Sequence, residues 1–542
     1  MKIEKYFFFC LSYLLVTVYC YPLFANEFNI FIPDDYQTIQ EGIDASSNNM
    51  TITVRSGTYK GSGNTDIDFK GKNIILISEN GAENTIIDCE GYNRGFYFQN
   101  NETDLSVLIG FKIINGTSDK GGNSDRPQYG GIFCSNSSPK IKNCIIENCY
   151  GPGINLHESS AVIENCQIIN NSKYGIYFQY SYPKLIGCNI SNNKIDGILM
   201  SEGSEPNISK CTINNNERNG VIYDRKSIPT IDRSVITGNH ENGIYCFTGG
   251  GGLIITSSII SNNFYRGFVL DYAWYHTYVV NCLITGHSYS SKGAAILANK
   301  SDLHIINCTI TKNSTTEYGG ALHVISSPTD IINSILWENP PYEISYKTDK
   351  PYIKNSVIQG GYDGTNVIST NPQFENFENN NFSLQSISPC IDTADSSYLA
   401  SDILFDVVGN IRIQGESLDI GAFEYIVKSA IVGNINTLVT GEKQPIVNAK
   451  ITLIPNNIFT YSDNDGNFVI NEIIEGNYSI KIEKQFFSPI LIEDIFVKPG
   501  ELTNLDAVEL IIDNDVGIFD INNDNKTGIE EAISILQTIS GM

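Results

Sequence analysis

The clearest chemical signal in this sequence is a run of oxygen-bearing residues near its C-terminus. Positions 1, 3, 5 and 7 of a twelve-residue segment offer an oxygen, from the side chains of Asp520, Asn522 and Asp524 and from the carbonyl of Lys526, and Glu531 can complete the shell at position 12. Ca²⁺ takes about six to eight oxygen ligands, and alternate residues of a tight loop can all point toward one ion. The segment therefore predicts a Ca²⁺ site, followed by a short helix.

A second set of candidates falls four and five positions after glycines that recur along the middle of the chain. We expect Glu202, Asp224 and Arg225 to cluster as catalytic residues, because carboxylates beside a basic group can perform acid–base chemistry. The substrate-binding candidates at equivalent positions are His157, Glu158, Tyr180, Asp271 and Tyr272. Their aromatic rings could stack on sugar rings. The stripe predicts contact with a glycan, with catalysis as a further hypothesis.

The elements that must position this stripe are visible as a repeat. A small polar residue or Cys followed by two β-formers marks ten anchors, which are Cys144, Cys166, Cys188, Cys211, Ser234, Ser258, Cys282, Cys308, Ser334 and Ser356. The anchors are 22 to 26 residues apart, and a Gly before an apolar run lies between them. This period predicts coils stacked along an axis. A leucine-rich frame is missing, so the predicted fold is all-β, a parallel β-helix on whose outer strand face the stripe lies.

Other repeated residues have structural interpretations. An Asn four residues after an anchor can enter a left-handed corner and hydrogen-bond to the next coil, and these residues are Asn148, Asn170, Asn192, Asn215 and Asn262. The anchor cysteines are expected to form an inward column of free thiols rather than disulfides or a metal site. The six His residues lie far apart in sequence, which favours structural roles over ligation.

The N-terminus and the charge predict an exported protein. Lys2 and Lys5 precede an apolar run, so residues 1–25 are expected to be a signal peptide. No later stretch approaches the ~20 apolar residues of a membrane span, so the mature chain is expected to have no transmembrane segment. A formal net charge of −25 disfavours nucleic acid and suits Ca²⁺ or neutral glycans. The predicted location is extracellular, secreted or at the cell surface.

The segment that precedes the coils resembles a known family. A short helical pattern through Ile39 and Ile43, a strand at 51–54 and the sequence Gly57-Thr58-Tyr59 are similar to the N-terminal cap of pectate-lyase-like right-handed β-helix proteins. The resemblance assigns residues 26–425 to such a domain. It implies that a catalytic site would combine Ca²⁺-binding carboxylates with a basic residue that abstracts a proton beside a uronate carboxyl. The motifs of polygalacturonases and mannuronan epimerases are missing from the sequence.

Three C-terminal segments carry further resemblances. The stretch from Asn371-Pro372 through Asp406 and Arg412 to Tyr425 resembles choice-of-anchor Q-type end segments, which implies a closing cap fixed by Asp–Arg pairs. Residues 429–511 alternate with period two between Asp-Gly and Gly-Asn turns, and they resemble carboxypeptidase regulatory-like β-sandwiches. Residues 513–542 resemble half of a dockerin. Because only one loop is present, a cohesin-like partner is not expected.

Two functions follow from these observations. The first is an exported β-helix protein that binds a polysaccharide or a cell-surface component. The second is a polysaccharide lyase or glycoside hydrolase that acts on acidic glycans. The sequence does not decide between them, because one scaffold serves both roles.

Overall fold

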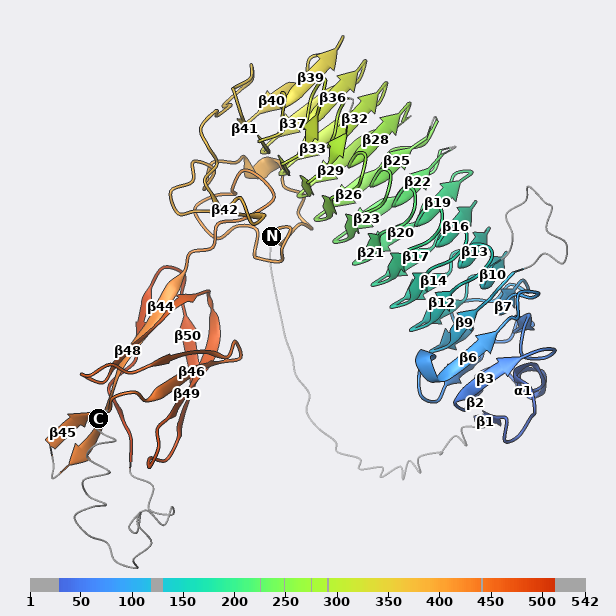
Figure 1. The fold of residues 1–542 in the computed structure, drawn as a ribbon, viewed down its shortest axis with the longest axis horizontal. Helices are drawn as coiled ribbons and strands as arrows, with labels where there is room; N and C mark the ends of the chain where they lie inside the picture. Colours follow the sequence, from blue (N-terminus) through green and yellow to red (C-terminus); the bar gives the residue numbers. More distant parts are fainter. Residues whose placement is uncertain are drawn as a thin grey trace, which may run out of the picture.

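The computed structural model describes residues 29–117, 130–224, 226–247, 249–273, 275–289, 292–439 and 442–511. Up to residue 358 the chain winds into a parallel β-helix of three sheets, shown in blue to yellow in Figure 1. Sheet 1 has 14 strands, from β1 (Asn29–Ile32) to β40 (Tyr352–Lys354), and sheet 2 has 13, from β3 (Gly57–Lys60) to β41 (Val357–Ile358). Sheet 3 has 12, from β4 (Ile67–Asp68) to β39 (Ile344–Lys347). The predicted β-helix is confirmed.

A single coil shows why this sequence forms three short strands. The coil passes through β16 (Ile176–Gln179) in sheet 3, β17 (Lys184–Ile186) in sheet 1 and β18 (Asn189–Ser191) in sheet 2. Alternate side chains of each strand point inward, and Phe178 and Leu185 are fully buried. Each strand pairs in parallel register with the equivalent strand of the next coil. The apolar side chains therefore stack on their equivalents in neighbouring coils and form one continuous core.

A buried ladder of amides runs beside this core, but not at the expected residues. The predicted corner residues, such as Asn215 (φ 54°), do adopt the left-handed conformation, and Asn215 is exposed. The residue that follows each of them points inward and bonds to its equivalent in the next coil. The ladder consists of Asn171, Asn193, Asn216, Asn239, Asn263, His287, Asn313 and Asn339. The ladder prediction was wrong by one residue, because a left-handed residue reverses which neighbour faces the core.

The repeated glycines are explained by this ladder. A Cβ atom on Gly197 would lie 2.6 Å from the carbonyl oxygen of Gly220 and 2.8 Å from the Nδ2 atom of Asn216. No side chain fits in that space. The glycine thus lets the chain pass close to the amide ladder before it enters sheet 3.

The N-terminal opening of the β-helix is covered as predicted. Helix α1 (Ile39–Ala45) begins at Thr38, whose side chain accepts from the backbone of Glu41 while the Glu41 side chain accepts from the backbone of Thr38. This capping box satisfies two free N–H groups of the first turn. Ile39 and Ile43 are fully buried against the first coil.

The end segment, 371–425, packs on the outer side of sheet 2. Strands β42 (Phe374–Asn376) and β43 (Asn381–Leu384) form a small antiparallel pair, and Phe382 joins a core cluster with Leu283 and Ile335 of the coils. Arg412 and Glu424 are both 1% exposed and form an ion pair at 3.4 Å. The predicted Asp–Arg pair was wrong in its acid, because the carboxylate partner of Arg412 is Glu424.

Residues 429–511 form a separate body with its own core, drawn in orange and red in Figure 1. One sheet is built around β44 (Ser429–Val439), with β45 (Glu442–Pro445) and β48 (Asn467–Ile473) antiparallel to it. The short strands β51 (Leu502–Asn504) and β52 (Val508–Glu509) pair with β44 in parallel. The second sheet has the order β47 (Ile458–Tyr461), β46 (Lys450–Ile454), β49 (Gly476–Glu483) and β50 (Ile490–Val497). Small antiparallel sheets are thus present where the period-two pattern predicts them.

Candidate functional site

The predicted stripe lies at one corner of the coils, where the chain leaves sheet 3 and enters sheet 1. Glu158, Tyr180, Glu202 and Tyr272 each directly follow a strand of sheet 3, and all four have φ between 50° and 58°. This left-handed residue ends the strand and turns the chain toward sheet 1. The expectation that the stripe lies on an outer strand face is therefore right for His157 and Asp271, the last residues of β13 (Ile154–His157) and β28 (Phe268–Asp271), and wrong for the residues that follow each strand. Its members lie at strand ends and in the turn itself.

Exposed aromatic side chains gather along this corner. We call them the aromatic corner, and they are Tyr180, Tyr182, Phe247, Tyr272 and Tyr275, each between 38% and 53% exposed. They occupy turns of the coils between β16 and β29 (Thr277–Val280). Coils are spaced by ~4.8 Å, so Tyr180 and Tyr272, four coils apart, lie roughly 19 Å from one another. Large aromatic rings at such exposure offer flat apolar surfaces along the axis of the β-helix.

The structure brings some of the predicted site residues together and separates others. His157 contacts the ring of Tyr180 edge-on, with centroids 6.1 Å apart. Asp271 accepts a hydrogen bond from the Nδ2 atom of Asn299 at 2.8 Å. The Nζ atom of Lys300 donates to the hydroxyl of Tyr272 at 2.9 Å. His157 and Glu158 therefore lie several coils away from Asp271 and Tyr272, at the other end of the same corner.

The three predicted catalytic residues lie between these two groups. Glu202 and Asp224 occupy consecutive coils, and Arg225 is outside the described residues. Burial raises the pKa of Asp224 to about 6, and its Oδ1 atom is buried with no hydrogen-bond partner among the described residues. A carboxyl with that pKa can both hold and release a proton near neutral pH. The predicted calcium loop, from Asp520 to Glu531, also lies outside the described residues.

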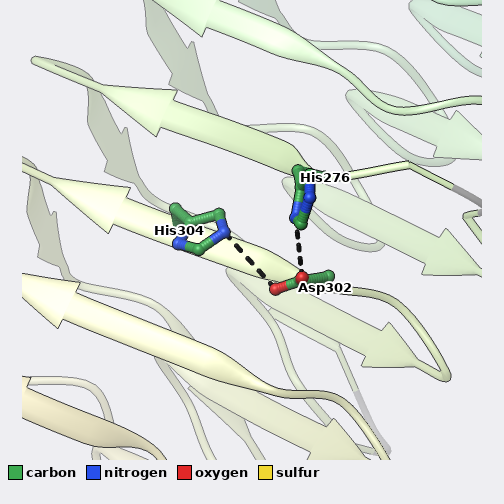
Figure 2. A group of neighbouring side chains, drawn as sticks. All are labelled: His276, Asp302 and His304. Carbon is green, nitrogen blue, oxygen red and sulfur yellow. Dashed lines mark ion pairs between the residues drawn. The ribbon is translucent and has the colours of Figure 1, made fainter.

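Beyond Tyr275, where the corner meets sheet 1, lies a compact group of imidazoles and carboxylates, which sequence reasoning missed. We call it the His–Asp cluster, and it consists of His276, Asp302, His304 and Asp330. The Nδ1 atom of His276 is 2.7 Å from Asp302 Oδ2, and the Nε2 atom of His304 is 3.4 Å from Asp302 Oδ1. Figure 2 shows the Asp302 carboxylate facing both rings. The Nδ1 atom of His304 is in turn 3.0 Å from Asp330 Oδ2.

Register in sheet 1 places these residues. His276 and Asp302 directly precede β29 and β33 (Leu303–Ile306), which are neighbours in the sheet. His304 pairs with Tyr278 of β29 on one side and with Asp330 of β37 (Thr329–Ile332) on the other. The rings of Tyr278 and His304 stack with centroids 4.7 Å apart. The cluster is therefore held by three adjacent strands and an aromatic contact.

His276 and His304 lie far apart in sequence, but the structure brings them together on one carboxylate, and a sequence signal for this was available. His276 and Asp302 each lie six residues before an anchor, Cys282 and Cys308. His304 lies four residues before Cys308, and Asp330 four before the next anchor, Ser334. Counting from the anchors rather than along the chain would have aligned all four residues. For His287 the structural role is confirmed, since it belongs to the buried ladder and burial lowers its pKa to about 4.

A second candidate is a hollow of about 760 Å³. It lies between the turns that lead each coil from sheet 1 into sheet 2 and residues 402–409 of the end segment. Two of its charged groups, Asp232 and Arg233, already pair with one another. Arg233 Nε is 2.6 Å from Asp232 Oδ2, and Thr256 donates to the other oxygen of Asp232 at 2.8 Å. The corner described above is the stronger candidate, because its aromatic rings and the imidazole of His276 are exposed to solvent.

No helix in the described ranges is both long and apolar enough to span a membrane.

Comparisons with known proteins give the following matches. Residues 130–284 match a family described as "Right handed beta helix region". No curated protein matches the chain. Among similar solved structures, pectate lyase Pel9A has a TM-score of 0.39 and 16% sequence identity, and the match covers 71% of this chain and 90% of that one. The A-module of Azotobacter vinelandii mannuronan C-5 epimerase AlgE6 has a TM-score of 0.36 and 13% identity, with 62% of this chain and 95% of that one covered. The periplasmic alginate epimerase AlgG has a TM-score of 0.33 and 13% identity, with 59% and 76% covered. The coils of this chain are thus a right-handed parallel β-helix.

Proposed function

We propose that this chain is an exported, extracellular or surface-located β-helix protein that binds a polysaccharide along the aromatic corner. The observation that carries the proposal is the row of half-exposed aromatic rings from Tyr180 to Tyr275. Exposing such rings to water is unfavourable unless a partner covers them, and a sugar ring is an apolar, flat partner of suitable size. Export is proposed from residues 1–25, which lie outside the described residues.

The polar groups of the corner fit a hydroxyl-rich ligand. Asp271 with Asn299 and Lys300 with Tyr272 are paired at the surface, where a sugar hydroxyl can replace or join each hydrogen bond. A linear polymer would lie along the β-helix axis, because the groups repeat in that direction from coil to coil. The formal net charge of −25 favours a neutral chain, or an acidic chain bridged by divalent cations.

The test is retention on a panel of neutral and acidic polysaccharides, with a double variant Tyr272→Ala, Tyr275→Ala. We expect its affinity to fall at least about tenfold, which corresponds to ~1.4 kcal/mol. Tyr150→Ala is the matched control, because Tyr150 is 55% exposed but lies in the turn between sheets 2 and 3. Equal affinity of the double variant and the wild type would refute the placement of the site. No retention of the wild type on any polysaccharide would refute the function.

A second function, polysaccharide cleavage, is favoured by one observation, the half-buried Asp224 with a pKa of about 6. In this proposal Asp224 and Glu202 act as acid–base groups with Arg225. The same panel is assayed for new reducing ends and for unsaturated products, which mark hydrolysis and elimination respectively. Asp224→Asn should abolish product formation without loss of retention. Product formation that survives this substitution would remove Asp224 from the site.

A further inference from the structure

The His–Asp cluster has the ligand types and the convergence of a metal site. One atom each from His276, Asp302 and His304 can be chosen so that all three lie within 4.8 Å of one another. Imidazole nitrogen combined with carboxylate oxygen suits zinc and the neighbouring transition metals, whereas Ca²⁺ and Mg²⁺ prefer oxygen alone. The three side chains come from two adjacent coils, so the register of sheet 1 already orients them.

Distances within the cluster are close to those of a bound ion. Two ligand atoms at ~2.0–2.1 Å from a tetrahedral zinc lie about 3.3 Å from one another. His304 Nε2 and Asp302 Oδ1 are already 3.4 Å apart. His276 Nδ1 and Asp302 Oδ2, now 2.7 Å apart, would need to separate by roughly 0.6 Å. The His276 side chain is 62% exposed, so it can make this movement without disturbing the core.

Asp330 supplies an independent argument. Its carboxylate accepts from the Nδ1 atom of His304 at 3.0 Å, which places the proton of a neutral ring on Nδ1. The lone pair then lies on Nε2, the atom that faces Asp302. That Nε2 atom is buried and has no hydrogen-bond partner among the described residues. A carboxylate behind a metal-binding His is the usual way in which proteins fix its tautomer and raise its basicity.

The charge of the cluster also favours a cation. With both imidazoles neutral, Asp302 and Asp330 contribute two negative charges. Within the described ranges, neither carboxylate forms an ion pair with a Lys or Arg. The nearby Lys300 is directed to Tyr272, whose hydroxyl and ring it contacts.

We propose that His276, Asp302 and His304 bind one divalent transition-metal ion, with Zn²⁺ as the representative ion, and that Asp330 positions His304. Three protein ligands leave a fourth position for water or for an oxygen of a ligand. His276 is 62% exposed and directly follows Tyr275 of the aromatic corner, so a ligand can reach the cluster from solvent. This proposal is independent of polysaccharide binding, since it needs only the metal.

The test is Zn²⁺ binding to the full, untagged chain by calorimetry, in a large excess of Ca²⁺ to saturate oxygen-only sites. We expect one Zn²⁺ per chain, and a Co²⁺ complex at the same site with visible absorption bands. His276→Ala should lower Zn²⁺ affinity at least tenfold, and because the side chain is exposed this variant should fold. Asp330→Asn should lower it about 10- to 100-fold, the usual effect of removing a carboxylate behind a His ligand. His240→Ala, at an exposed His in another turn, is the matched control and should bind as the wild type does.

Three results would overturn the proposal. The first is no Zn²⁺ binding by the wild type, which would make the cluster a set of ion pairs only. The second is unchanged affinity in His276→Ala. The third is displacement of Zn²⁺ by Ca²⁺ at comparable concentration, which would exclude nitrogen ligation. Circular dichroism of each variant checks that the coils are intact, so that weaker binding reports the site rather than unfolding.

Discussion

The amide ladder makes the substitution Asn216→Ala a strong test of how the coils are held together. The Oδ1 atom of Asn216 accepts from the backbone N–H of Asn193 at 3.1 Å and from its Nδ2 at 2.9 Å. Its own Nδ2 donates to the carbonyl of Ile190 at 3.2 Å and to Asn239 Oδ1 at 2.9 Å. Asn216 is fully buried. Alanine can make none of these side-chain bonds, and water cannot reach the groups that it leaves.

The expected cost follows from counting the groups left without a partner. Two N–H groups of Asn193 lose their acceptor and the carbonyl of Ile190 loses a donor. Each such group costs about 1–3 kcal/mol, and partial relaxation reduces the total, so we expect about 3–5 kcal/mol. In a solenoid this loss falls mainly on the substituted coil and its neighbours. Amide exchange of Asn193 should therefore accelerate at least ~100-fold, at ~1.4 kcal/mol per tenfold.

Hydrogen exchange read by mass spectrometry on the peptide that contains Asn193 measures this local effect. Asn215→Gly is the matched control, because Asn215 is adjacent but exposed and left-handed, and Gly238 occupies the equivalent corner of the next coil with φ 64°. Its exchange should stay within a few fold of the wild type. If Asn216→Ala accelerated exchange no more than Asn215→Gly does, the ladder would contribute little and the apolar core alone would hold the coils.

Three other predictions concern a buried carboxyl group, the buried thiols and the C-terminal loop. Burial raises the pKa of Glu343 from 4.5 to about 7, so the folded state holds a proton that the unfolded chain releases, and stability falls as pH rises from about 4.5 to 7. Glu343→Gln mimics the protonated form, so the free energy of unfolding of this variant, relative to that of the wild type, should rise by about 3 kcal/mol between pH 4.5 and pH 7. Urea titrations measure this difference, and a difference that did not change with pH would contradict the raised pKa of Glu343. The eleven thiols that are buried within the described residues should react slowly in the native state, since burial raises the pKa of Cys149 to about 12, and all eleven should react after denaturation. Disulfides found by mass spectrometry would contradict this. The C-terminal loop from Asp520 to Glu531 should bind one Ca²⁺ with a dissociation constant no better than ~10⁻⁴ to 10⁻³ M. Equal calorimetric heats for the full chain and for its Asp520→Ala, Asp524→Ala variant would show that the loop holds no Ca²⁺ site.

The parallel β-helix could be predicted because its cause is periodic. The anchors from Cys144 to Ser356 repeat because every coil must place a small side chain at the same buried point, and the glycines repeat because every coil passes close to the amide ladder. The helix that caps the coils could be predicted from the spacing of Ile39 and Ile43. Thr38 and Glu41, which fix its start, follow the same local chemistry.

Local conformations that reverse the chain were harder to predict. A strand's period of two assigns inward and outward faces, but Asn215 at φ 54° shifts that assignment, so Asn216 and not Asn215 points inward. The partner of Arg412 was also missed. Glu424 lies twelve residues away in an irregular loop, where no repeat relates sequence distance to distance in space. In both cases the chain geometry, rather than residue type, carries the missing information.

The His–Asp cluster illustrates how the junction between a corner and a sheet of a solenoid can hold exposed side chains in fixed positions. Backbone pairing fixes the register of the strands on both sides of the corner, as the pairing of Thr277 with Leu303 shows. The turn that joins the two strands of one coil can lengthen without altering the core. His276 and Asp302 stand at the end of such turns, so their side chains reach solvent although their backbones are held by the sheet. A site that combines exposure with fixed positions is preorganised for a ligand. For this reason we expect substitutions of the outward-facing residues in and beside the turns to change binding, and substitutions of the inward-facing residues of the strands and the ladder to change stability.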